Sequence, residues 1–202
     1  TSVQSVRAAQ APARVAISMA QHIGAPCTPL VKPGAHVLMG QKIGEPAGFM
    51  GAPVHASVSG TVKALETRVL ANGAAAQCVV IENDFKDEWD SSLVPPEDVQ
   101  SMTREELTAY TREKGIVGLG GAAFPTSIKL SPAAEKPIDY VILNGAECEP
   151  FLTCDHRMML ENSAAIVDGL KYAMRISGAA NGVIAIEENK PDAIEAMIKK
   201  YI

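Results

Sequence analysis

The spacing of apolar residues changes once along this chain of 202 residues, and this change limits the possible folds more than any other feature. Residues 13–82 consist of short β-prone runs separated by glycine and proline. From residue 138 onward, strand-like and helix-like segments alternate instead. The first pattern is typical of an all-β domain and the second of a parallel α/β sheet. We therefore expect an all-β domain followed by an α/β domain.

Glycine-containing pairs and alternating residues define the expected strands of the first domain. Glycine accepts the positive φ values that tight turns need. The three expected turns are Pro33-Gly34, Met39-Gly40 and Ser59-Gly60. Within residues 54–59, apolar side chains alternate with His55, Ser57 and Ser59, which predicts a strand with one buried and one solvent-exposed face.

An acidic stretch that contains two prolines separates the two patterns. Residues 84–100 read DFKDEWDSSLVPPEDVQ, a composition typical of an exposed connection between domains. We place the domain boundary here, with a β-rich domain and its linker in residues 1–95 and an α/β domain in residues 96–202.

The second domain is expected to begin with a helix and to continue as a βαβα unit. Thr103 and Glu106 have the spacing of a capping box, which predicts a helix that stops at Gly115. The expected strands are residues 138–144 and 182–188, and the expected helices are residues 155–177 and 191–202. A strand, helix and strand in this order form a parallel pair with a right-handed crossover. Two strands are too few to complete a parallel sheet, so we expect more strands after residue 202.

Bulk composition excludes several classes of function. The formal net charge is −5, whereas binding to nucleic acid relies on an excess of Lys and Arg. We therefore expect no nucleic-acid partner. No apolar run approaches the roughly 20 residues that a transmembrane helix needs, and residues 1–10 lack the regions of a signal peptide, so the chain is expected to be soluble.

The cysteines do not have the spacing of a metal or cluster site. None of the four forms a C-x-x-C pair, so local spacing provides neither a zinc site nor a ferredoxin-type cluster, and we expect no metal ligands and reduced thiols. The four cysteines are Cys27, Cys78, Cys148 and Cys154.

The glycine-rich stretch of residues 115–130 is the first candidate site. Gly118, Gly120 and Gly121 allow close approach of a ligand and expose successive backbone amides, which favours binding of a phosphate. Lys129 adds a cation that could reach a phosphate or the edge of a reduced flavin. A tight turn beneath a packed helix is the structural alternative.

The second candidate site is the sequence NGAECEP at residues 144–150, directly after the first parallel strand. Ligands of open α/β sheets bind outside the carboxyl ends of the strands, so Asn144, Glu147 and Glu149 lie where a site is expected. Carboxylates there could accept hydrogen bonds from ribose hydroxyls or a nicotinamide amide. The alternative is a solvated loop with an acid that caps a helix.

The two stretches together carry a family resemblance. GLGGAAFPTSIKL followed by NGAECEP resembles the FMN- and NADH-binding signature shared by the flavoprotein subunit of respiratory NADH dehydrogenase, the RnfC subunit of the Rnf electron transport complex and a cobalamin reductase. Ala123 stands where relatives often have a further glycine, and Ala146 where the respiratory flavoprotein has an aspartate. The resemblance implies that Gly118, Gly120, Gly121, Lys129 and Asn144 bind FMN, and that Phe124, Glu147 and Glu149 lie nearer the NADH.

The β-rich region resembles the two halves of a biotinyl or lipoyl carrier domain. The halves read LVKPGAHVLMGQKIG and PVHASVSGTVKALE. Carrier domains present a modifiable lysine on the hairpin between the halves, but residues 45–53 read EPAGFMGAP, so we expect a structural or docking role instead. A carrier-like domain before the flavin signature is the arrangement of RnfC, and the resemblance to RnfC extends from about Val15 onward.

The resemblance implies both a fold and a function. The expected fold is an N-terminal barrel-sandwich domain followed by a partial Rossmann-like α/β domain that binds FMN. The expected function is electron transfer in a membrane-bound, ion-translocating ferredoxin:NAD oxidoreductase, in which NADH and FMN exchange electrons with 4Fe-4S clusters outside these residues, and no side chain need act as an acid or base. This fragment alone is expected to be inactive.

Partners and location follow from the same resemblance. The expected partners are the other Rnf subunits, through which the protein would attach peripherally to the cytoplasmic face of the plasma membrane. The alternatives are a flavoprotein of the cobalamin reductase type and a non-catalytic docking module.

Overall fold

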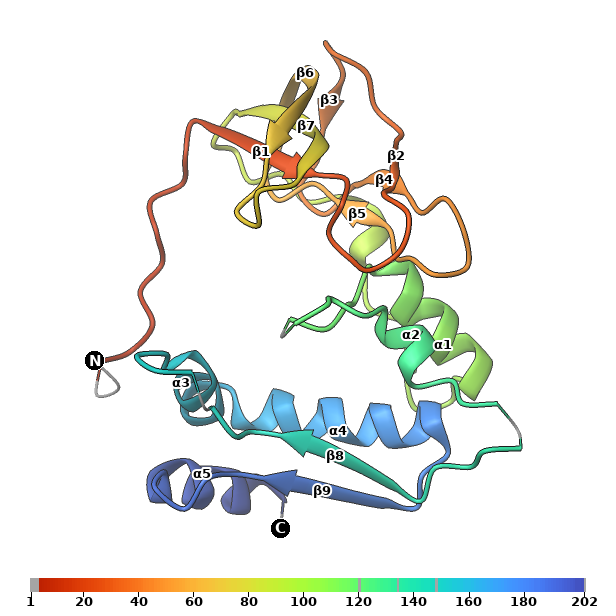
Figure 1. Cartoon of the computed structure of the whole chain (residues 1–202), viewed down its shortest axis with the longest axis vertical. Helices are drawn as coiled ribbons and strands as arrows, with labels where there is room; N and C mark the ends of the chain where they lie inside the picture. Colours follow the sequence, from red (N-terminus) through yellow and green to blue (C-terminus); the bar gives the residue numbers. More distant parts are fainter. Residues whose placement is uncertain (1–3, 120, 134, 148, 202) are drawn as a thin grey trace. The chain divides into compact units, whose positions relative to one another are not determined.

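The computed structural model describes residues 4–119, 121–133, 135–147 and 149–201. These residues form two compact units, which we describe separately (Figure 1). The first unit, here called the barrel unit, is Gln10–Lys129. The second, here called the α/β unit, contains Leu130–Ile202 and Thr1–Ala9 as far as they are described.

The barrel unit contains two antiparallel sheets. One sheet has the strand order β1-β7-β6-β3 and the other β2-β4-β5. The strands are β1 (Arg14–Ser18), β2 (Thr28–Pro29), β3 (His36–Val37), β4 (Lys42–Glu45), β5 (Val54–His55), β6 (Gly60–Val69) and β7 (Ala75–Asn83). The predicted all-β character of this region is confirmed.

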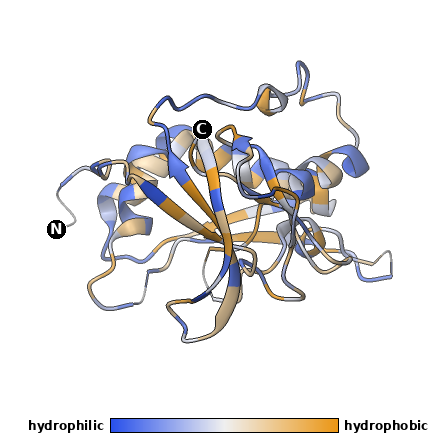
Figure 2. Cartoon of the chain, turned by 90° about the horizontal axis from the view of Figure 1, so that it is seen from above, coloured by the Kyte–Doolittle hydropathy of each residue, from blue (hydrophilic) through white to orange (hydrophobic). Residues whose placement is uncertain are grey.

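Apolar side chains from both sheets fill one core. The strands carry runs of hydrophobic residues (Figure 2). Its fully buried members include Met19, Val37, Ile43, Val62 and Ile81. Burial of such side chains contributes roughly 1.5–3 kcal/mol each, which makes this core the main source of stability for the unit.

Ser59 and Gly60 differ from the sequence prediction. Gly34 and Gly40 lie in turns with positive φ as expected, but Gly60 begins β6 with a φ of 149°. A Cβ atom there would lie 2.0 Å from the Glu82 carbonyl oxygen, so glycine serves close strand packing rather than a turn. Ser59 is fully buried and donates a hydrogen bond to Asp84 Oδ1 at 2.7 Å, so the prediction of a wet face at this position was wrong.

The acidic stretch after β7 is mostly exposed and contains the short helix η1 (Ser91–Leu93). It is also attached to the barrel unit through its backbone. The Met39 amide donates to the Glu88 carbonyl at 2.8 Å, and the Asp90 amide donates to the Met39 carbonyl at 2.9 Å. The domain boundary after residue 95 stays a prediction.

Helix α1 (Arg104–Glu113) begins at the predicted capping box. The Glu106 amide donates to the Thr103 side chain, and the Glu106 side chain accepts from the Thr103 amide. The helix ends at Lys114, and Gly115 follows with a φ of 69°. Helix α2 (Thr126–Lys129) packs beside α1 and closes the unit (Figure 1).

The α/β unit has two parallel strands and three helices, as the βαβα prediction required apart from one break. The elements are β8 (Tyr140–Asn144), α3 (Cys154–Glu161), α4 (Ser163–Ser177), β9 (Asn181–Ala185) and α5 (Pro191–Tyr201). The prediction of one continuous helix over residues 155–177 was wrong. Asn162 interrupts it with a φ of −131°, and asparagine and serine are poor formers of helix interiors because their side chains compete for backbone hydrogen bonds.

Helix α4 packs against both strands of this sheet. Gly182 lies directly beneath it, because a Cβ atom there would meet Met174 Sδ at 2.6 Å. The opposite face presents Tyr140, Ile142 and Val183 to solvent. Further strands after residue 202 stay a prediction. In the part of the chain that the structure describes, no helix is both long and apolar enough to cross a bilayer.

Candidate functional site

The glycine-rich stretch forms a loop closed at its base. Val117 and Pro125 form an antiparallel bridge, and the Thr126 amide donates to the Ile116 carbonyl at 3.0 Å. One step further in, the Gly118 amide donates to the Phe124 carbonyl at 2.9 Å. The amide of Gly118 is therefore used to close the loop and is not presented to a ligand.

The tip of this loop, residues 119–123, is open. Leu119 is 100% exposed, and a Cβ atom added to Gly121 would have nothing within 4 Å. Among the described residues, none accepts a hydrogen bond from the amide of Leu119, Gly121 or Ala122. Gly120, the remaining predicted glycine, lies outside the described residues.

The backbone of the loop takes up left-handed conformations at two places. Gly121 has a φ of 76° and Ala123 a φ of 50°. The second value gives a physical reason for a glycine at position 123 in relatives, because alanine has to be held in a region that costs an L residue roughly 1 kcal/mol.

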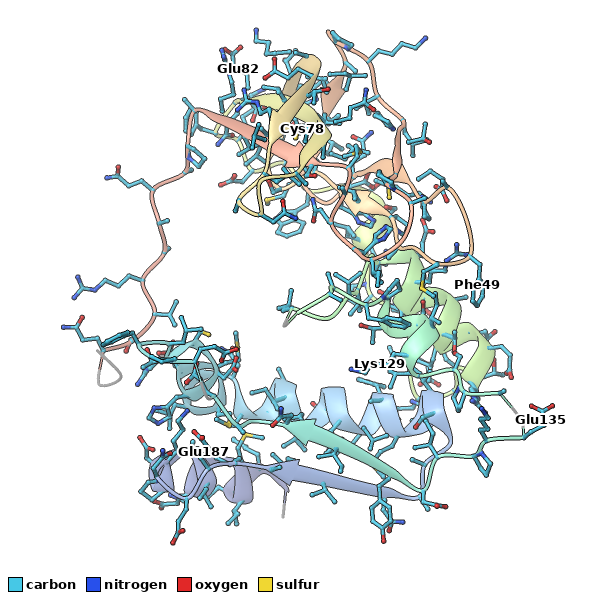
Figure 3. The ribbon with its side chains drawn as sticks, viewed as in Figure 1. Phe49, Cys78, Glu82, Lys129, Glu135 and Glu187 are labelled. Carbon is cyan, nitrogen blue, oxygen red and sulfur yellow. The ribbon has the colours of Figure 1, made fainter. Side chains whose placement is uncertain are left out.

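Lys129 ends α2 and is exposed (Figure 3). Helix α2 is a single turn, with the amides of Ile128 and Lys129 both donating to the Pro125 carbonyl. Phe124 is half-buried beside the loop base. The structure thus brings Gly118, Gly121, Phe124 and Lys129 together in the barrel unit.

The other three predicted residues lie in the α/β unit, at the carboxyl end of β8. Asn144 is exposed, and its Oδ1 accepts a hydrogen bond from the Ala146 amide at 3.1 Å. The Gly145 amide donates to the Ala185 carbonyl at 2.7 Å, which extends the pairing of β8 and β9 by one residue. Glu149 is exposed, and its side chain is available to a ligand.

Glu147 occupies a different environment, because its side chain is only 1% exposed. Its Oε1 accepts a hydrogen bond from the Asp155 amide at 2.9 Å, in the first turn of α3. Its Oε2 lies 3.0 Å from Lys190 Nζ. Thr153, the N-cap residue of α3, makes no side-chain capping bond, so Glu147 caps this helix from outside.

These contacts control the ionisation of Glu147. Burial alone would raise its pKa, but the bonds from the Asp155 amide and the Lys190 ammonium outweigh burial and lower the pKa to about 2. The carboxylate is therefore charged at neutral pH and fully engaged within the protein. This matches the helix-capping alternative that the sequence left open.

Cys154 and Asp155 lie beside Glu147, with ligand atoms within 4.8 Å of one another. The Cys154 thiol donates to Glu147 Oε1 at 3.4 Å, and this bond raises the pKa of the thiol. Because the Lys190 ammonium already neutralises the carboxylate, this cluster is not a built cation site.

Lys190 is the residue that the sequence interpretation missed. It also lies 3.4 Å from Glu187 and has a side chain only 13% exposed. It follows the second parallel strand, as Glu147 follows the first. Since parallel strands place their carboxyl ends at one edge, the two loops could have been paired from the sequence, although no motif marks the lysine itself.

Two family models match different parts of the chain. Residues 1–86 match the RnfC barrel sandwich hybrid domain, and residues 111–201 match the Nuo51 FMN-binding domain. The second match covers both the glycine-rich loop and the end of β8. The predicted barrel-sandwich and FMN-binding domains are thereby confirmed as domain types.

Curated relatives extend the similarity over nearly the whole chain. It is 50% identical over 188 residues to the RnfC subunit of the Na(+)-translocating ferredoxin:NAD(+) oxidoreductase complex of Acetobacterium woodii, covering 93% of the chain and 42% of that protein. It is 42% identical over 201 residues to the corresponding subunit of the proton-translocating complex of Clostridium ljungdahlii, covering 100% of the chain and 44% of that protein.

A third relative is the corresponding subunit of the ion-translocating oxidoreductase complex of Rhodobacter capsulatus, which is 41% identical over 190 residues, 93% of the chain and 36% of that protein. The chain thus spans less than half the length of these relatives. With the barrel sandwich hybrid domain and the FMN-binding domain matched in this order, the chain belongs to the RnfC family.

Proposed function

We propose that the protein containing this chain is the RnfC subunit of a membrane-bound, ion-translocating ferredoxin:NAD oxidoreductase. In this proposal it exchanges electrons between NADH and FMN and passes them to 4Fe-4S clusters held outside these residues. The names of the relatives and the match to an FMN-binding domain support the assignment. The three relatives are all RnfC subunits and give no support to a cobalamin reductase.

The loop at residues 118–124 fits a flavin phosphate. The observation that carries the proposal is its open tip, where the described amides of Leu119, Gly121 and Ala122 have no acceptor within the described protein. Clustered backbone amides attract a phosphate because each carries a partial positive charge. Lys129 would add a full positive charge at the same end of the unit.

When bound, FMN would supply the redox chemistry, and the side chains would supply binding and orientation. Asn144 and Glu149, both exposed at the end of β8, are our candidates for contacts with the flavin and with NADH, respectively. Glu147 would act indirectly, because its carboxylate already fixes the loop between β8 and α3. We place the protein at the cytoplasmic face of the membrane, attached through its partner subunits.

Titration of the full-length protein with FMN tests this proposal. We expect saturable quenching of flavin fluorescence, and Lys129→Ala should weaken FMN binding roughly tenfold, which corresponds to about 1.4 kcal/mol for one charged contact. Lys32→Ala, which removes another exposed lysine of the barrel unit, should leave FMN affinity unchanged. Failure of the unaltered protein to bind FMN would favour the docking alternative.

A further inference from the structure

The barrel unit lacks the lysine that would make it a carrier, and its β4–β5 hairpin makes three contacts that suggest another task. The first contact comes from Arg112, near the end of α1. Its Nη2 donates to the Gly48 carbonyl at 3.1 Å, and its Nε donates to the Gly51 carbonyl at 3.5 Å. One guanidinium thus holds both sides of the hairpin tip that carries Phe49 (Figure 3).

The second contact is an ion pair between the hairpin and the next residue of α1. Lys42 Nζ lies 2.7 Å from Glu113 Oε1 and 3.1 Å from Glu45 Oε2. The hydrogen bond with Glu113 raises the pKa of Lys42, so the pair is charged at neutral pH. The lysine side chain is 29% exposed, which limits solvent screening on that side of the pair.

The third contact is steric and involves Gly115, which directly follows α1. Its φ is 69°, and a Cβ atom there would lie 2.5 Å from the Pro53 carbonyl oxygen. The same atom would lie 3.0 Å from Nδ1 of His55, a half-buried residue of β5. The hairpin therefore packs so closely on this residue that any side chain would displace it.

These contacts all act at the start of the glycine-rich loop. Gly115 is followed by Ile116, whose carbonyl accepts the Thr126 amide, and by Val117, which bridges to Pro125. The base of the loop is thus continuous with the hairpin contacts, and a shift at Gly115 passes to both sides of the loop.

We propose that the β4–β5 hairpin of the barrel sandwich domain positions the glycine-rich loop for FMN, with Arg112, Lys42 and His55 as positioning residues. The hairpin that bears the modified lysine in carrier domains would here be a fixed support for a cofactor loop. Pre-organised amides bind an anion more tightly because the loop is ordered before the ligand arrives. This inference rests on the proposed function.

Gly115→Ala in the full-length protein tests the steric contact. Its matched control is Gly73→Ala, in the turn between β6 and β7, where φ is 80° and an added Cβ atom would have nothing within 4 Å. Both substitutions carry the same backbone strain, but only the first pushes the hairpin away. We expect FMN affinity to fall at least tenfold in Gly115→Ala and by less than twofold in Gly73→Ala.

A second pair of variants avoids the strain. Arg112→Met removes the two bonds to the hairpin, and Arg104→Met removes an exposed arginine from the other end of the same helix. We expect Arg112→Met to weaken FMN binding at least threefold and to change the visible circular dichroism of the bound flavin, at a melting temperature within 2 °C, or about 0.5 kcal/mol, of that of Arg104→Met. This pair decides the matter if Gly115→Ala does not fold.

The outcomes separate the two proposals. Equal FMN affinity in the unaltered protein, Arg112→Met and any folded Gly115→Ala would overturn the positioning role while leaving the flavoprotein assignment in place. Absence of FMN binding by the unaltered protein would overturn the assignment and the positioning role together. Weaker binding by both variants with normal binding by both controls supports the positioning role.

Discussion

Glu147→Gln tests the internal role of the acidic residue at the end of β8. The substitution keeps the size of the side chain but removes the charge that faces Lys190 at 3.0 Å. Loss of one partner of a buried ion pair costs about 3–5 kcal/mol. Because Lys190 keeps Glu187 at 3.4 Å, we expect a loss near the lower end, about 3 kcal/mol.

The pKa gives a similar magnitude and a pH dependence. A shift from 4.5 to about 2 corresponds to about 3 kcal/mol at neutral pH. Because the pKa of Glu147 is lower in the folded protein, its contribution is complete above pH 5 and is lost as the pH falls from 4.5 towards 2. Glu147→Gln should lack this part of the acid sensitivity.

Hydrogen exchange measured by mass spectrometry reports this locally in the full-length protein. Amides of α3 should exchange faster in Glu147→Gln by the factor that about 3 kcal/mol implies, up to roughly a hundredfold. Glu195→Gln is the matched control, because its partner Lys199 and Glu195 itself are both 68% exposed. Unchanged protection of α3 in Glu147→Gln would refute the capping role.

Two further substitutions test the backbone geometry of the barrel unit. Ala123→Gly should raise the free energy of unfolding by about 0.5–1 kcal/mol in urea denaturation, because it relieves a positive φ of 50°, and a loss of stability would contradict the left-handed assignment. Gly60→Ala should lower the free energy of unfolding by more than about 2 kcal/mol, because its Cβ atom would lie 2.0 Å from the Glu82 carbonyl oxygen, and a wild-type melting curve would contradict that close approach.

Much of the fold could be predicted because it depends on local signals. The capping box at Thr103 and the left-handed Gly115 define α1 from a few residues, and Pro191 starts α5 as its preference for the first helical turn requires. The parallel pairing of β8 and β9 follows from the order of strand and helix.

The misses involve interactions between residues distant in sequence. Ser59 is buried because Asp84, 25 residues later, accepts its hydroxyl hydrogen, which no alternation pattern can reveal. Lys190 reaches Glu147 across 43 residues. The break at Asn162 reflects weak helix propensity that the apolar periodicity of the surrounding residues concealed.

The candidate site divides in the same way. The glycine-rich loop and Lys129 were identified by residue type, but the use of the Gly118 amide to close the loop onto Phe124 requires the folded backbone. For Glu147, position at a strand end predicted proximity to a site, whereas its contacts show a carboxylate engaged by its own protein.

A crystal or cryo-electron-microscopy structure of the full-length protein with FMN tests the central claim most directly. We predict that the FMN phosphate lies within hydrogen-bond distance of the amides of Gly121 and Ala122, with Lys129 Nζ beside the flavin or its phosphate. A phosphate bound elsewhere, with the loop at residues 118–124 unoccupied, would contradict the account.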